Sequence, residues 1–275
     1  MNFSEKLAGA VEANNSLVCV GLDPDFSQVN FPEHIKNVAD PLFTFNKAII
    51  DATADIASVY KPNSAFYESM GAMGIEQLKM TCDYIKEKYP NIPIILDAKR
   101  ADIGNTNNGY GVFAFDYLSA DALTVHPYLG GEALEPFLAR KDKGIIVLCR
   151  TSNPGAAEFQ DLEIDGNKLY KTVAEKVSKN WNINGNCMLV VGGTFPSELT
   201  DVRAIVGQEM NILVPGIGAQ GGDLEATLLA GLNNKKTGLL ISASRSIIYA
   251  SGGVNFAEAA RTEAINLKNE INKFR

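Results

Sequence analysis

The segment IPIILDAKRADIGNT, residues 92–106, joins an apolar run to a group of charged residues. Its first five residues have the composition of a buried strand, and the charges begin directly after Leu96. Because side chains alternate along a strand, a strand that continues to Lys99 would point Asp97 and Lys99 in the same direction. A carboxylate beside an ammonium favours the charged ammonium, which a general acid requires. A purely structural ion pair would give the same local pattern.

Seven further apolar runs bounded by turn residues repeat the strand pattern. The eight predicted strands cover residues 17–22, 58–61, 92–96, 122–125, 144–149, 188–191, 212–214 and 239–241. Helical patterns lie between and after them, at residues 41–54, 74–88, 106–118, 131–139, 168–180, 197–206, 223–231 and 256–273. Alternating buried strands and helices indicate an α/β protein with a parallel sheet covered on both faces. Eight such units predict one (β/α)8 TIM barrel domain over residues 1–275.

An open, doubly wound sheet is the competing architecture. That fold would carry a glycine-rich dinucleotide motif after its first strand, where this chain reads GLDPD at residues 21–25. The sequence therefore favours the barrel. The polar segment 158–167, which lacks clear periodicity, is expected to be a loop that could cover a ligand.

The charge of the chain limits its partners. A net charge of -7 over 275 residues argues against nucleic acid or an anionic membrane surface, so an anionic ligand must meet a local group of cations. Without a signal-like or membrane-spanning run, a cytoplasmic location is expected. The four cysteines lack paired spacing and predict buried thiols. Two distant histidines predict no histidine-rich metal site, although a carboxylate site for magnesium stays open.

Polar residues follow most of the predicted strands, and catalytic groups of this barrel lie at these carboxyl ends. They are Asp23 after the first strand, Lys61 at the end of the second with Asn63 after it, Asp97 and Lys99 after the third, and the TSNPG segment 151–155 after the fifth. The glycine-rich segment 215–222 follows the seventh strand, and Arg245 follows the eighth. This pairing predicts a phosphate site formed by backbone N–H groups, a helix N-terminus and a guanidinium. A tight turn without a ligand would also need the glycines.

The motif DAKRADIGNT at residues 97–106, with YKPN at 60–63 and PGIG at 215–218, resembles the orotidine 5'-phosphate decarboxylase family. The resemblance covers nearly the whole chain and fits the longer bacterial branch, type 2. Ala101 stands where that branch often has glycine. The resemblance implies decarboxylation of orotidine 5'-phosphate to UMP and CO2, the last step of de novo UMP biosynthesis. It also implies catalysis without metal or organic cofactor and a homodimer with shared active sites.

The resemblance assigns catalytic roles to four matching residues. Lys61, Asp97 and Lys99 belong to the charged network of one subunit, while Asp102 reaches into the site of its neighbour. Lys99 would stabilise the carbanion that forms at C6 and then protonate it. Asp97 would lie against the departing carboxylate and position Lys99.

The resemblance also implies a set of substrate-binding residues. They are Asp23 and Asn63 at the ribose or the charged network, Ile103 and Thr106 contributed by the neighbouring subunit, Ser152 at the pyrimidine, Gln220 and Arg245 at the phosphate, and Pro215 and Ser244 along the pocket. Phosphate binding would supply energy for closing loops and excluding water.

Three other functions stay open at this stage. A magnesium-dependent decarboxylase of sugar phosphates has a similar barrel and a related Asp-x-Lys-x-x-Asp pattern, but Lys61 stands where its carboxylate ligand would be expected. A Schiff-base aldolase would use a desolvated lysine to attack a carbonyl. A sensor of a phosphorylated metabolite would not need the charged triad.

Overall fold

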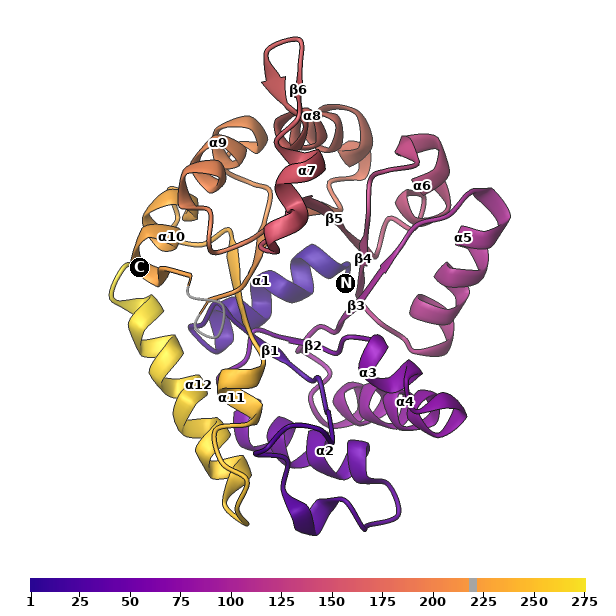
Figure 1. The fold of residues 1–275 in the computed structure, drawn as a ribbon, viewed down its shortest axis with the longest axis vertical. Coiled ribbons are helices and arrows are strands. Elements are labelled where there is room, and N and C mark those ends of the chain that lie inside the picture. The colour runs from indigo at the N-terminus through magenta and orange to yellow at the C-terminus, as the bar shows by residue number, and fades with distance from the viewer. Residues whose placement is uncertain (218–221) are drawn as a thin grey trace.

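The structure, a computed structural model, describes residues 1–217 and 222–275 and contains an eight-stranded sheet in which every neighbouring pair is parallel. The strands are β1 (Val18–Gly21), β2 (Val59–Lys61), β3 (Ile95–Arg100), β4 (Ala122–Val125), β5 (Gly144–Arg150), β8 (Cys187–Val191), β9 (Ile212–Pro215) and β10 (Leu239–Ala243). Their order is β2-β1-β10-β9-β8-β5-β4-β3, and two isolated bridges, Tyr60 to Ile94 and Asn63 to Asp97, join β2 to β3. The predicted parallel (β/α)8 barrel is confirmed (Figure 1).

Helices follow the strands and form the outer ring of the barrel (Figure 1). The longer ones are α2 (Pro41–Thr53), α4 (Gly71–Lys88), α5 (Gly104–Gly111), α6 (Gly130–Leu138), α8 (Leu169–Lys176), α9 (Pro196–Val206), α10 (Leu224–Gly231) and α12 (Phe256–Asn272). Two of them continue as wider π-helical turns, α5 into η2 (Val112–Tyr117) and α8 into η4 (Val177–Trp181). Each overlaps a predicted helix, since apolar faces at helical spacing pack against the sheet.

The N-terminal helix α1 (Phe3–Ala13) is absent from the predicted elements. Asn2 and Glu5 form a reciprocal capping box at its start, and this spacing was a readable sequence signal. Phe3 and Leu7 pack with the side chains that fill the inside of the barrel, such as Ile95. Helix α1 therefore closes the end of the barrel opposite the strand carboxyl ends (Figure 1).

The segment 158–167 differs from the expected loop. Helix α7 (Ala157–Gln160) leads into a two-stranded antiparallel hairpin, β6 (Glu163–Ile164) with β7 (Asn167–Lys168), which projects from the barrel in Figure 1. Asp165 and Gly166 both have positive φ, 52° and 79°, as the central residues of a type I′ turn require. The Asp-Gly pair was the signal for this hairpin.

The remaining elements are short and were not predicted. They are α3 (Ala65–Glu68), α11 (Arg245–Ile248), η1 (Glu33–Ile35), η3 (Pro154–Ala156) and η5 (Asn182–Asn184). All four cysteines are buried free thiols, as predicted. No helix in the described part of the chain is long and apolar enough to cross a membrane.

Candidate active site

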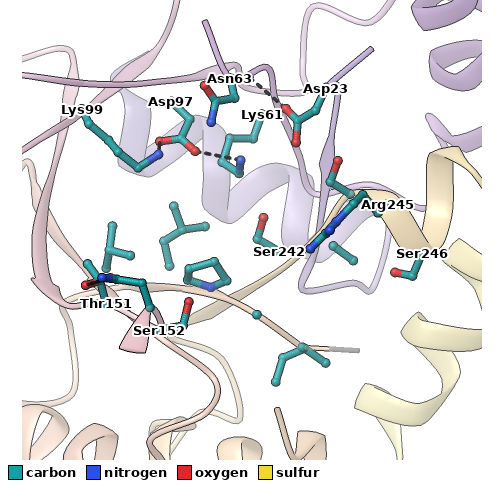
Figure 2. Close-up of a pocket in the computed structure, with 18 of the residues that line it drawn as sticks. Asp23, Lys61, Asn63, Asp97, Lys99, Thr151, Ser152, Ser242, Arg245 and Ser246 are labelled. Atoms are coloured by element: carbon teal, nitrogen blue, oxygen red, sulfur yellow. Dashed lines mark hydrogen bonds and ion pairs between the residues drawn. The ribbon is translucent and has the colours of Figure 1, made fainter. Parts of the chain in front are cut away.

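A cavity of about 640 Å³ opens at the carboxyl ends of the strands. Its lining includes most of the predicted site residues, namely Asp23, Lys61, Asn63, Asp97, Lys99, Ser152, Pro215, Ser244 and Arg245. Parallel strands end at the same rim of a barrel, so residues far apart in the sequence meet there. Figure 2 shows Lys99, Asp97 and Lys61 on one side of the cavity and Arg245 and Ser246 across from Lys99.

Asp97 lies between two lysines. Lys61 Nζ is 3.1 Å from Asp97 Oδ2, and Lys99 Nζ is 2.7 Å from Asp97 Oδ1. The Lys61 side chain is 7% exposed whereas that of Lys99 is 48% exposed, so Lys61 is the buried partner and Lys99 reaches the cavity. Both lysines of this Asp97–Lys61–Lys99 triad therefore line the cavity, with Lys99 the more exposed and Lys61 the more buried of the two.

The two buried members of the triad hold each other in their charged forms. Burial alone would raise the pKa of the Asp97 carboxyl, but the charges of Lys61 and Lys99 outweigh it and hold this pKa well below its usual range. Burial alone would lower the pKa of Lys61, but Asp97 and Asp23 outweigh it and raise this pKa. Asp97 and Lys61 are thus a charged pair near neutral pH.

Strand β3 continues through Lys99, but its backbone is irregular there. The Lys99 φ of 46° lies in the left-handed region, and the pairing of β3 with β4 is irregular between Leu96 and Arg100. The Lys99 ammonium still reaches Asp97, because this local backbone turn replaces the simple alternation of side chains. Asp97 and Lys99 therefore meet as expected, on a strand that reaches Lys99 but is irregular at that residue.

Asp23 holds the neighbouring loop in place. Its Oδ1 accepts a hydrogen bond of 3.0 Å from the backbone N–H of Asn63. The hydroxyl of Tyr249 donates to the backbone carbonyl of Asp23 at 2.8 Å. A Cβ added to Gly21 would overlap Ser244, so glycine is required where β1 and the loop after β10 approach each other.

The wall after β5 contains two residues that sequence reasoning missed. Gln160 lines the cavity, accepts from the backbone N–H of Thr151 at 2.8 Å and donates to the Thr151 hydroxyl at 2.9 Å. Arg150, which is 2% exposed, donates to Gln160 and Asp161 and lies 3.9 Å from the ring centroid of Phe195. These contacts attach α7 to the wall that contains Ser152, and no sequence motif marked them.

The opposite end of the cavity contains Arg245 at the start of α11 and the segment that begins at Pro215. No ion pair joins Arg245 to a carboxylate within the described residues. Gly216 has a φ of 95°, which glycine tolerates. The buried Ser244 hydroxyl has no hydrogen-bond partner among the described groups. Gln220, predicted at this end, lies outside the described residues.

Asp102, Ile103 and Thr106 do not line this cavity in the described chain. The Asp102 carboxylate accepts a hydrogen bond of 2.7 Å from the backbone N–H of Ile103. Ile103 itself is 62% exposed. Thr106 lies beside a separate shallow pocket with Arg100 and Tyr110. In a single chain, these three residues are therefore not part of the cavity that contains the triad.

The described residues contain no group of three or more His, Cys, Asp or Glu side chains placed to hold a metal ion. The candidate catalytic groups are instead the two lysines, the carboxylate between them and the arginine at the far end. An ammonium next to a cavity can stabilise negative charge and donate a proton to it. An arginine without an ion-pair partner suits an anionic group such as phosphate.

Comparison with known proteins places these features in context. Residues 16–260 match the model of the Orotidine 5'-phosphate decarboxylase / HUMPS family. The chain is 49% identical over 274 residues to orotidine 5'-phosphate decarboxylase of Janthinobacterium sp. (strain Marseille), covering 100% of this chain and 99% of that protein. It is 50% identical to the enzyme of Dechloromonas aromatica (strain RCB), covering 100% of both. The structure of OMP decarboxylase from Leishmania donovani aligns with a TM-score of 0.86 at 38% identity, covering 100% of this chain and 98% of that one.

Proposed function

The chain belongs to the orotidine 5'-phosphate decarboxylase / HUMPS family, and on this premise we propose that Lys99 is the proton donor to C6 of orotidine 5'-phosphate. The enzyme is an orotidine 5'-phosphate decarboxylase, which converts this nucleotide to UMP and CO2 in the last step of de novo UMP biosynthesis. The observation that carries the assignment is the 2.7 Å contact of Lys99 with Asp97 at the cavity.

The reaction needs a cation at C6 because of where its electrons go. When the bond from C6 to the carboxylate breaks, the electron pair stays in an in-plane orbital that the pyrimidine π system cannot absorb. A preorganised ammonium stabilises this charge electrostatically, and its proton then forms the new C6–H bond. Lys99, exposed to the cavity and paired with Asp97, has the required position and charge.

Asp97 and Lys61 support the same step. Asp97 lies against the departing carboxylate and keeps the Lys99 ammonium in place. Lys61 balances the buried Asp97 carboxylate, which would otherwise be a costly unpaired charge. Asp97 and Lys61 therefore stay charged and keep the site preorganised while Lys99 gives its proton to C6.

The rest of the cavity binds the substrate. Asp23 and Asn63 are adjacent at the sugar position, and Ser152 lies on the wall that would face the pyrimidine. Arg245 binds the phosphate, with Pro215 and Ser244 along the same end of the cavity. The separation of Arg245 from Lys99 in Figure 2 supports this orientation.

The active enzyme is a homodimer with shared sites. Asp102, Ile103 and Thr106 lie outside the cavity of their own chain, and exposed Ile103 is available to a second copy. In the dimer, Asp102 of each subunit completes the charged network of its partner. A cytoplasmic location stays a prediction of the sequence.

A direct assay tests the reaction. Purified, chelator-treated protein is incubated with orotidine 5'-phosphate while the ultraviolet absorbance of the substrate is followed. We expect full activity after chelation and UMP as product. Loss of activity that returns with magnesium would indicate a metal-dependent reaction, and absence of turnover with or without metal would overturn the proposed function. Trapping of a substrate adduct by borohydride would indicate Schiff-base chemistry instead.

A further inference from the structure

Thr124 on β4 contacts both Asp97 and Lys99. Its hydroxyl accepts a hydrogen bond from the backbone N–H of Lys99 at 3.0 Å and donates one to Asp97 Oδ1 at 2.8 Å. A hydroxyl has one proton and two lone pairs, so both bonds can form at once. Thr124 is 1% exposed and is not among the described residues that line the cavity. Its contacts therefore reach the triad and not a ligand in the cavity.

The register of β3 and β4 explains why the Thr124 side chain, and not the β4 backbone, accepts the hydrogen bond from the Lys99 N–H. Leu96 pairs with Leu123 and Arg100 pairs with Val125, so residues 97–99 stand opposite Thr124 alone. Extra residues on one strand interrupt the ladder and leave backbone groups without their regular partners. The Thr124 side chain supplies the acceptor that the β4 backbone does not offer to the Lys99 N–H.

The conformation of Lys99 needs such support. A φ of 46° is unfavourable for a residue with a Cβ atom and persists only when its surroundings hold it. Two interactions hold Lys99 in the described structure: the Thr124 hydroxyl on its backbone and Asp97 on its ammonium. The same hydroxyl also fixes the Asp97 oxygen that Lys99 contacts.

We propose that Thr124 is a positioning residue, whose hydroxyl holds the left-handed turn at Lys99 and aims the Lys99 ammonium at the reacting carbon. This inference rests on the proposed role of Lys99 as proton donor. Without the hydroxyl, the Lys99 N–H and Asp97 Oδ1 each lose a partner, and the Lys99 backbone can relax toward extended geometry. The ammonium then moves away from C6, while the phosphate end at Arg245 keeps its contacts.

Three variants of this position test the inference. Thr124→Val removes the hydroxyl and keeps the shape of the side chain. Thr124→Ala removes the hydroxyl and also makes the side chain smaller. Thr124→Ser retains the hydroxyl. The matched control is Thr81→Val on α4, where a buried hydroxyl donates to the backbone carbonyl of Gln77 at 2.8 Å, away from the cavity. For each variant, kcat and KM for orotidine 5'-phosphate, UMP affinity and thermal unfolding are measured beside the wild type.

We expect kcat to fall by about 10- to 100-fold in the folded Val or Ala variant, with KM and UMP affinity changed by less than about threefold. Thr124→Ser should recover most of kcat, and Thr81→Val should lose thermal stability without losing kcat. Unchanged kcat in either folded hydroxyl-free variant would overturn the inference, as would a loss that serine does not recover. An inactive wild type would instead overturn the proposed function, so the two failures are distinguishable.

Discussion

Arg245 and Lys99 lie at opposite ends of the cavity, so they can act on two separate parts of one anionic nucleotide (Figure 2). Arg245 is remote from the bond that breaks. Binding energy from such a remote group can still lower the barrier when it orders the site and excludes water around the charges. The arginine should therefore affect both affinity and rate.

Arg245 is exposed in the structure, and a bound phosphate would bury its guanidinium, so Arg245→Ala should weaken UMP binding by about 2–5 kcal/mol. The dissociation constant for UMP, measured by calorimetry, checks it. Arg261→Ala is the control, because Arg261 pairs with Asp55 outside the cavity lining. Unchanged affinity in Arg245→Ala, or an equal loss in the control, would contradict the assignment.

Some of the site residues could be placed from the sequence, and others could not. The gathering of Asp23, Lys61 and Asp97 was predictable, because parallel strands end at one rim. The left-handed turn at Lys99 was not, since it depends on how β3 pairs with β4. Thr124 lies inside an apolar run and resembles any strand threonine until its partners are known.

At the scale of elements, α1 closes the barrel from the end opposite the cavity. Phe3 lies against Gly144 at the start of β5, where an added Cβ would overlap its ring. Phe3 is 3% exposed and packs with Leu7 and the barrel interior. This helix should therefore stabilise the fold without touching the reaction.

Phe3→Ala should lower the free energy of unfolding by about 3–5 kcal/mol, because it leaves a cavity among packed side chains. At a temperature where the variant is folded, kcat should be unchanged. Urea unfolding and steady-state kinetics measure the two effects. Exposed Glu12 on the same helix provides the control variant, Glu12→Ala, which should be close to the wild type in both. A stability loss no larger than that of the control would show that α1 does not close the barrel as described.

The same helix gives a pH prediction through Lys6, whose Nζ is 3.1 Å from Asp121 Oδ2. Burial lowers the pKa of Lys6 to about 8 despite this contact. The unfolded chain then binds more protons than the folded one between about pH 8 and the usual lysine pKa of 10.5, so the Lys6 contribution to stability rises with pH across this window. The unfolding free energy of the wild type minus that of Lys6→Met should therefore become more positive from pH 8 to 10.5. A constant or shrinking difference would refute this.

Element positions were largely predictable, but some boundaries and additions were not. The run 122–125 gave β4 with its observed bounds, since it is a short apolar segment between turn residues. The continuation of β3 through Arg100 was not predicted, because its last residues are charged and irregularly paired. The hairpin of β6 and β7 lacks an apolar face, so only its Asp-Gly turn marked it.

At the scale of the whole molecule, the active site extends beyond one chain in our proposal. Exposed apolar residues occur on the loop and helices that follow β3, with Ile103 62% exposed, Val112 52% and Tyr117 45%. Apolar groups exposed near residues that a site needs are consistent with an interface between two copies. The single-domain organisation of residues 1–275 stays a prediction.

Mixing two inactive variants tests the shared site. In a hybrid dimer of Lys99→Ala and Asp102→Ala subunits, one site keeps both an intact Lys99 and an intact Asp102. Random exchange makes half of the dimers hybrid with one working site each, so roughly one quarter of wild-type activity should return. Each variant alone stays inactive. No recovery after proven subunit exchange would show that Asp102 does not cross the interface.

Measuring turnover and product binding of Lys99→Ala in parallel separates the role of this lysine in the reaction from its role in binding. We expect decarboxylation of orotidine 5'-phosphate to be nearly abolished while UMP affinity largely survives, because Arg245 and the rest of the cavity remain. Turnover at the wild-type rate in this variant would contradict the assignment of Lys99 as proton donor.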